Sequence, residues 1–158
     1  MSRIYVLYNP LANNGRSTEA IKGCEKGLDG EYILCDMTKG YGEIIREMQG
    51  DDTLIICGGD GTLNRFVNEV GAENIKGDIM YFACGSGNDF AHDIGLERDA
   101  APVSIKKYLF DLPEAEIAGK SYKFINAIGF GIDGYCCEEG DKLREKKRKS
   151  YEELVSEK

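Results

Sequence analysis

The chain has 158 residues, 42% of them apolar, and a formal net charge of -8 from 20 basic and 28 acidic residues. This length suits one domain, or one domain and the start of another, and the apolar content argues against a wholly disordered chain. The excess of acidic residues excludes a general nucleic-acid-binding surface, which needs a basic face. No apolar run approaches the ~20 residues that span a bilayer.

Apolar runs of strand length alternate with glycine-containing loops over residues 1–101. Between these runs, apolar side chains recur at the spacing of a helix face, most clearly over residues 63–70. Alternation of strand, loop and helix predicts an α/β fold, a parallel sheet flanked by helices. The expected strands cover residues 3–8, 32–35, 53–57 and 79–84, and the expected helices cover residues 17–28, 41–48 and 63–70.

The pattern changes after Pro102. Residues 103–110 are expected to form one short helix. Residues 115–118 and 122–128 are expected to pair as a β-hairpin around Gly119 and Lys120. We therefore predict an α/β domain over residues 1–112. Residues 113–158 are expected to hold the start of an antiparallel β domain, incomplete because too little chain follows, and a charged tail.

The cysteines and the N-terminal residues indicate the cellular compartment of the protein. There are six cysteines and one histidine, and no C-x-x-C pair or other zinc-ligand spacing occurs. Residues 1–3 lead into a strand-like segment without the apolar core of a signal peptide. Buried, reduced thiols and a cytoplasmic location are therefore expected. The cysteines are Cys24, Cys35, Cys57, Cys84, Cys136 and Cys137.

Three loops that follow predicted strands are candidates for binding phosphate, at residues 9–16, 58–62 and 85–89. Ligands of open α/β sheets bind beyond the carboxyl ends of the strands. Glycines let backbone N–H groups approach phosphate oxygens, and the helix behind each loop adds positive potential. Asp60 and Asp89 would repel phosphate unless Mg²⁺ lies between, or unless a carboxylate orients a hydroxyl. A single glycine loop of this kind is explained by a tight turn between a strand and a helix. Three such loops at one edge of the sheet favour a phosphate-binding site.

The motifs in these loops resemble the diacylglycerol kinase catalytic domain family, which includes bacterial lipid kinases, sphingosine kinases and ceramide kinases. The order and spacing of the motifs cover about residues 1–134. The Gly-Gly-Asp-Gly-Thr motif is shared with NAD kinases and phosphofructokinases, whereas Gly-x-Gly-Asn-Asp-Phe-Ala favours lipid kinases. Ser86, Ala83 and His92 depart from the usual Thr, Pro and Arg of the family. The motifs are Asn9-Pro10, Gly58-Gly59-Asp60-Gly61-Thr62-Leu63-Asn64 and Gly85-Ser86-Gly87-Asn88-Asp89-Phe90-Ala91.

The resemblance implies an ATP-dependent lipid kinase that uses Mg²⁺ and transfers the γ-phosphate of ATP to a lipid hydroxyl. It implies that the nucleotide lies between the α/β domain and a β-sandwich. Asp60 is the candidate for a catalytic role, or for holding the metal through water. The residues implied to contact the nucleotide are Asn9, Pro10, Leu11, Ala12, Asn13, Thr38, Gly58, Gly59, Asp60, Gly61, Thr62, Leu63, Asn64, Ser86, Asn88 and Asp89.

The acceptor side is expected to be incomplete. In the family, the base toward the acceptor and the carboxylates that hold magnesium-bound water come from far along the second domain, and this chain ends first. We therefore expect the chain alone not to phosphorylate lipids. Two alternatives stay open, namely an NAD kinase-like enzyme with Asp60 as the base toward a ribose hydroxyl, and a non-catalytic nucleotide-binding or assembly module.

Two further partners are expected. The hairpin offers strand edges and the apolar residues Phe124, Ile128 and Phe130 to a second copy, which predicts a homodimer. The basic run at residues 142–149 is either a solvated helix or tail, or a peripheral contact with an anionic membrane surface. The identity of the acceptor lipid is not readable from the sequence.

Overall fold

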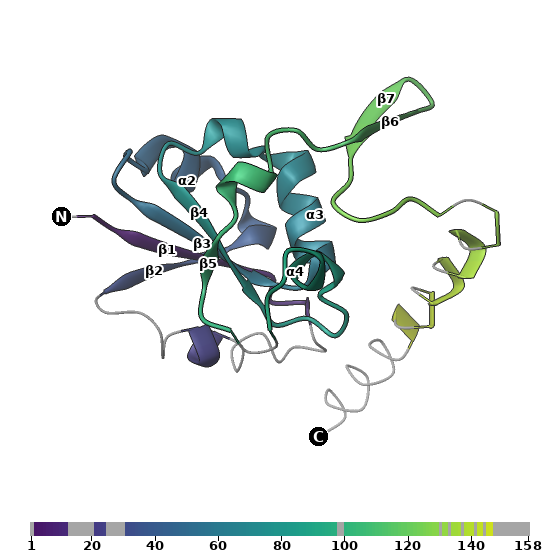
Figure 1. Ribbon diagram of the computed structural model, residues 1–158, viewed down its shortest axis with the longest axis horizontal. Helices are drawn as coiled ribbons and strands as arrows, with labels where there is room; N and C mark the ends of the chain where they lie inside the picture. The colour runs from purple at the N-terminus through teal and green to yellow at the C-terminus, as the bar shows by residue number, and fades with distance from the viewer. Residues whose placement is uncertain are drawn as a thin grey trace. The chain divides into compact units, whose positions relative to one another are not determined.

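In the computed structural model, the chain forms two compact units, Met1–Asn126 and Ala127–Lys158. The first unit contains the sheet, the helices around it and a hairpin (Figure 1). The predicted boundary after residue 112 falls between the sheet and this hairpin, and it stays a prediction. The structure describes residues 2–12, 21–24, 31–97, 100–129, 131–132, 134–136, 138–140, 142–143 and 145–146.

A five-stranded sheet forms the centre of the first unit, in the order β2-β1-β3-β4-β5 (Figure 1). Strands β1 to β4 run parallel to one another, and β5 runs antiparallel to β4. This mostly parallel sheet with flanking helices confirms the predicted α/β class and the strands predicted over residues 3–8, 32–35, 53–57 and 79–84. The strands are β1 (Ile4–Tyr8), β2 (Tyr32–Asp36), β3 (Thr53–Gly58), β4 (Asp78–Ala83) and β5 (Val103–Ser104).

Helices follow the strands in the predicted order. The helices are α2 (Gly42–Glu47), α3 (Asp60–Glu69) and α4 (Asp89–Asp93). Short 3-10 turns form η2 (Met37–Lys39), η3 (Ala72–Asn74) and η4 (Lys106–Tyr108). Of the helix predicted over residues 17–28, the described residues 21–24 are helical, and the rest lies outside the described residues.

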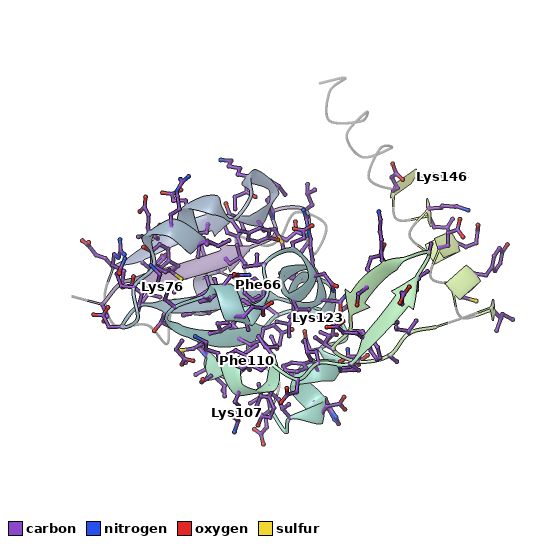
Figure 2. The ribbon with its side chains drawn as sticks, turned by 90° about the horizontal axis from the view of Figure 1, so that it is seen from above. Phe66, Lys76, Lys107, Phe110, Lys123 and Lys146 are labelled. Atoms are coloured by element: carbon purple, nitrogen blue, oxygen red, sulfur yellow. The ribbon has the colours of Figure 1, made fainter. Side chains whose placement is uncertain are left out.

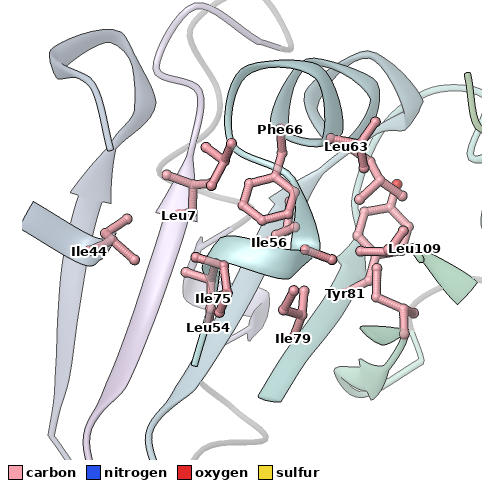
Figure 3. Close-up of a cluster of buried hydrophobic side chains, with 14 of the residues drawn as sticks. Leu7, Ile44, Leu54, Ile56, Leu63, Phe66, Ile75, Ile79, Tyr81 and Leu109 are labelled. Carbon is pink, nitrogen blue, oxygen red and sulfur yellow. The ribbon is translucent and has the colours of Figure 1, made fainter. Parts of the chain in front are cut away.

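Apolar side chains pack on both faces of the sheet, because successive residues of each strand point to opposite sides. On β3, Leu54 and Ile56 join the core beneath α3, whereas Ile55 and Cys57 join the core with the helical residues 21–24. Figure 3 shows Phe66 of α3 packed beside Ile56 of the sheet. The predicted apolar stripe on α3 is confirmed by the burial of Leu63, Phe66, Val67 and Val70.

The helix predicted over residues 103–110 is wrong. Residues Val103–Ser104 form strand β5 on the open edge of β4, where Val103 lies opposite Tyr81. The next residue, Ile105, donates its N–H to the carbonyl of Ile79 at 2.8 Å. Pro102 and the β-branched Val103 favour extended backbone, and β4 offers unpaired backbone groups to pair with it. Only the turn η4 remains of the predicted helix.

The β-hairpin is present, but its turn lies one residue earlier than predicted. Strands β6 (Glu114–Ile117) and β7 (Lys120–Lys123) are joined by Ala118 and Gly119. Both linking residues have positive φ, 52° and 76°, as a two-residue type I′ hairpin turn requires. Strand β7 ends at Lys123, so residues 124–128 are not part of the strand.

In the second unit, every described residue from 134 to 146 is helical. The predicted basic run therefore begins on a helix. Lys142, its first residue, pairs with Glu138 at 2.8 Å and with Glu139 at 2.9 Å, so its charge is matched within its own helix. Within the described part of the chain, every helix is too short or too polar to span a lipid bilayer.

A buried carboxylate joins the amino end of β1 to that of β3. Asp52 is 2% exposed, and one oxygen accepts the Arg3 N–H at 2.8 Å. The other accepts the Gln49 N–H at 2.8 Å and the Arg3 guanidinium at 2.9 Å. Burial alone would raise the pKa of Asp52, but these hydrogen bonds and the Arg3 charge lower it to about 2. The ionised carboxylate therefore stabilises the fold.

We predict that Asp52→Asn lowers the free energy of unfolding by about 1 to 3 kcal/mol near neutral pH, the scale for hydrogen bonds to a charged group. Because the folded pKa lies below the usual value of 3.8, the stabilisation is present above about pH 4 and is lost as the pH falls through about 2. Urea unfolding at several pH values measures both effects. The exposed neighbour Asp51→Asn is the matched control, and equal behaviour of the two variants would contradict the prediction.

Candidate functional site

The predicted site residues follow strands whose carboxyl ends meet at one edge of the sheet. In the parallel register, Tyr8 of β1 lies between Asp36 of β2 and Cys57 of β3. Gly58 of β3 lies opposite Ala83 of β4. The same edge of the sheet therefore carries the loops after β1, β3 and β4 and the turn η2 after β2. This is the edge at which open α/β sheets bind ligands.

The loops after β3 and β4 touch through their backbones. A Cβ added to Gly85 would lie 2.5 Å from the Cα of Gly59, and one added to Gly59 would lie 2.9 Å from the Cα of Gly85. Such distances are shorter than any real Cβ contact, so both positions require glycine for this approach. Just before the contact, the N–H of Cys84 donates to the carbonyl of Gly58 at 3.0 Å. The two motifs therefore form one continuous backbone surface.

The Asp60 side chain joins the two loops by hydrogen bonds. One carboxylate oxygen accepts the N–H of Asp89 and the other accepts the N–H of Phe90, each at 3.0 Å. These donors are the first N–H groups of α4, so Asp60 caps a helix that lies 29 residues further along the chain. Each carboxylate oxygen retains a second lone pair. Asp60 therefore has a structural role that the sequence reasoning missed, and acceptor capacity remains for a hydroxyl or a metal-bound water.

Asn88 shapes the second loop from within. Its backbone is left-handed, with φ of 59°, a conformation that asparagine tolerates better than most residues. Its side-chain oxygen accepts the N–H of Gly85 at 2.8 Å, and its amide donates to the Gly85 carbonyl at 2.9 Å. The Asn88 side chain is therefore engaged with its own loop, whereas the neighbouring Ser86 is exposed.

The amino end of α3 has no side-chain cap. The carbonyl of Gly59 accepts the N–H groups of Thr62 and Leu63 at 3.0 and 3.1 Å, which leaves the N–H groups of Asp60 and Gly61 as the first donors of the helix. Uncapped helix N–H groups and the helix dipole together favour a bound anion. The first turn of α3 thus provides donors that suit a phosphate group.

Two residues of this turn that were predicted to contact the nucleotide are buried. Thr62 is 5% exposed and Leu63 is fully buried. A Cβ on Gly58 would lie 2.5 Å from the Cβ of Thr62, so the end of β3 must be glycine to admit the threonine. Thr62 and Leu63 therefore support the loop from beneath, and the exposed Gly61 is the part of the turn that a ligand can reach.

The predicted residues after β1 and β2 form local turns. The side-chain oxygen of Asn9 accepts the N–H of Leu11 at 3.0 Å, and its carbonyl accepts the N–H of Ala12 at 3.1 Å. Pro10 lies within this turn. Asn13 lies outside the described residues. The loop after β1 is thus fixed at its start, next to the end of β3 in the sheet order.

Thr38, which the resemblance implies as a nucleotide contact, lies in the turn η2 after β2. Its N–H and hydroxyl both donate to one carboxylate oxygen of Asp36, at 2.9 and 2.7 Å. The Thr38 hydroxyl lowers the pKa of Asp36 through this hydrogen bond. Thr38 follows the edge strand β2, and β1 separates it from β3. The structure therefore does not bring Thr38 next to Gly58 and Gly59.

The sulfur atoms of Cys57 and Cys84 lie 3.6 Å apart at the start of the two glycine loops. The neighbouring Cys84 thiol and burial raise the pKa of Cys57. The described cysteines form no disulfide. The predicted burial holds for Cys24 and Cys57, whereas Cys35 and Cys84 are partly exposed and Cys136 is exposed.

The described residues offer few ligands for a metal ion. Among the described residues, no three His, Cys, Asp or Glu side chains are placed to bind a metal ion together. Mg²⁺ is commonly bound by one or two carboxylates together with substrate phosphates. Asp60 and the exposed Asp89 beside it fit that arrangement.

One family model matches the part of the chain that carries these loops. The family model of the diacylglycerol kinase catalytic domain matches residues 3–110. The chain belongs to this family. The match covers the whole five-stranded sheet and both glycine motifs, so the resemblance read from the motifs is confirmed. No curated protein matches the chain.

The contact between the glycine loops gives a stability prediction. Gly85→Ala should lower the free energy of unfolding by about 1 to 3 kcal/mol, the usual cost of overpacking, because the new methyl group meets the backbone of Gly59. Chemical unfolding followed by circular dichroism measures it. Gly61→Ala is the matched control, since a Cβ there meets no atom within 4 Å. A Gly85→Ala protein as stable as this control would contradict the close approach.

Proposed function

We propose that the chain binds ATP with Mg²⁺ at the carboxyl edge of the sheet, as the nucleotide-binding part of a kinase that phosphorylates a lipid hydroxyl. The observation that carries the proposal is the uncapped amino end of α3 beside the Gly59–Gly85 contact. Membership in the diacylglycerol kinase catalytic domain family supports the lipid as acceptor class.

The residues of this chain have binding and orienting roles in the proposed reaction. The N–H groups of Asp60 and Gly61 donate to phosphate oxygens at the positive end of α3. The exposed Gly61 leaves the first turn of α3 open to phosphate, since a Cβ there would meet no atom within 4 Å. Mg²⁺ bound with the nucleotide would neutralise phosphate charge, and phosphoryl transfer depends largely on such positioning and charge neutralisation.

Asp60 is proposed to act on the nucleotide side through its remaining lone pairs. Its oxygens are held by the N–H groups of Asp89 and Phe90, so the carboxylate keeps a fixed orientation. A fixed carboxylate orients a metal-bound water or a hydroxyl at little further entropic cost. The same hydrogen bonds make Asp60 necessary for the loop geometry, and the experiment must separate these two roles.

We predict that Asp60→Ala weakens the binding of Mg-ADP by about 1 to 3 kcal/mol, the scale for a lost charged hydrogen-bonding group. Isothermal titration calorimetry with and without Mg²⁺ separates the two roles. A larger loss for Mg-ADP than for ADP assigns the carboxylate to the metal, and equal losses assign it to the loops alone.

Asp93→Asn is the matched control, because Asp93 is an exposed carboxylate at the far end of α4. Unchanged affinity of the Asp60→Ala protein would remove Asp60 from the site. Absence of ADP binding by the unaltered chain would refute the proposed function. The same titration with NAD tests the NAD kinase-like alternative, for which we expect no binding.

Two proposals about partners are independent of the nucleotide site. Self-association through the hairpin is proposed from its exposed Ile117 and Tyr122, which are 45% and 43% exposed. A peripheral contact between residues 142–149 and an anionic membrane is proposed from the basic charge of this run. Lys142, its first residue, pairs with Glu138 and Glu139.

A further inference from the structure

One side chain of α3 binds the backbone of the hairpin. The amide nitrogen of Asn68 donates to the carbonyl of Lys123 at 2.8 Å, and its oxygen accepts the Lys123 N–H at 2.9 Å. Both backbone groups of one β7 residue are thus paired with one amide side chain, 55 residues away in sequence. A neighbouring strand would offer the same donor and acceptor.

The Asn68 side chain is itself held on the helix. Its amide nitrogen also donates to the carbonyl of Asn64, one turn earlier, at 2.9 Å. This third hydrogen bond restricts the side-chain rotamer toward the hairpin, so that less conformational entropy is lost when Lys123 binds. Asn68 is therefore preorganised to receive the strand end.

Two weaker contacts act at the same end of the hairpin. The ammonium of Lys123 lies 3.4 Å from a carboxylate oxygen of Glu73, and the N–H of Phe124 donates to the Pro113 carbonyl at 3.1 Å. Ile125 then packs partly against the main core. Figure 2 shows Lys123 at the base of the hairpin beside α3, the helix that carries Phe66. The tip of the hairpin is exposed.

The hairpin depends on this anchor. A two-stranded hairpin is marginally stable in water without further packing. Among the residues that the structure describes, its two strands pair only with each other, so the orientation of the hairpin is set at its base, by Asn68 and the contacts around Lys123. Asn68 lies eight residues after Asp60 on α3, about 12 Å along the helix axis.

We propose that Asn68 is a positioning residue, which fixes the hairpin on the helix whose first turn is the proposed phosphate site. The chain that follows the hairpin then starts from a fixed place relative to the nucleotide. The link to the nucleotide rests on the proposed function, whereas the anchoring of the hairpin does not. Because the Asn68 amide pairs with Lys123, it also closes the β7 edge at that residue against other strands.

Hydrogen exchange of the full chain, followed residue by residue by NMR, tests this role. In Asn68→Ala, we expect the amide of Lys123 to exchange about three- to tenfold faster, the range for loss of one or two exposed hydrogen bonds. Amides of β3, such as that of Ile55, should keep their exchange rates. Trypsin should cleave after Lys120 and Lys123 faster in this variant.

Asn68→Asp tests the two hydrogen bonds to Lys123 separately. It keeps an oxygen that accepts the Lys123 N–H, but it replaces the amide donor with a carboxylate oxygen beside the Lys123 carbonyl. We therefore expect the Lys123 amide to exchange faster than in the unaltered chain and more slowly than in Asn68→Ala. Exchange as fast as in Asn68→Ala would overturn the proposed pairing. The control is Arg65→Ala, which removes an exposed ion pair with Glu69 on the same helix and should leave Lys123 protected.

Two other results would overturn the proposal. One is an unchanged exchange rate of Lys123 in Asn68→Ala. The other is equally faster exchange of the β3 amides, which would make Asn68 a general stabiliser of the fold.

Calorimetry separates the anchor from the nucleotide site. The Asn68→Ala protein should bind Mg-ADP with the same affinity as the unaltered chain. If the unaltered chain binds no ADP, the proposed function fails while the exchange data still test the anchor.

Discussion

The candidate site depends on the contact between Asp60 and the start of α4. The Asp60 carboxylate is bound by two backbone N–H groups from the loop after β4, and the backbones of Gly59 and Gly85 touch beside it. Together with the hydrogen bond from Cys84 to Gly58, these features hold the loops after β3 and β4 against each other. The two hydrogen bonds also fix the direction of the Asp60 carboxylate at this edge.

Helix α3 connects the features that matter for function. Its first turn presents uncapped N–H groups, its buried face carries Phe66 and Leu63 into the core, and Asn68 on its exposed side holds the hairpin. These three features lie on one helix of ten residues. The packing of α3 on the sheet therefore sets the relative positions of the proposed nucleotide site and the hairpin.

The fold was largely predictable from the sequence, since buried parallel strands and amphipathic helices leave strong patterns. The errors are local. The strand β5 was missed because Val103 and Ser104 are too short a segment to carry a period, and their conformation depends on the open edge of β4. The hairpin turn was placed one residue late because Ala118, with positive φ, lacks the usual turn preference for glycine or asparagine.

For the site, the sequence by itself determined the family, the α/β class and the sheet edge at which the glycine motifs gather. These follow from residue order and local spacing. Only the tertiary structure decided that Asp60 caps α4, that Thr62 is buried, that Thr38 lies beyond β1, and that Asn68 pairs with Lys123. Most of these findings concern residues that are far apart in the chain. The distances between such residues depend on the order of the strands and on the packing of the helices.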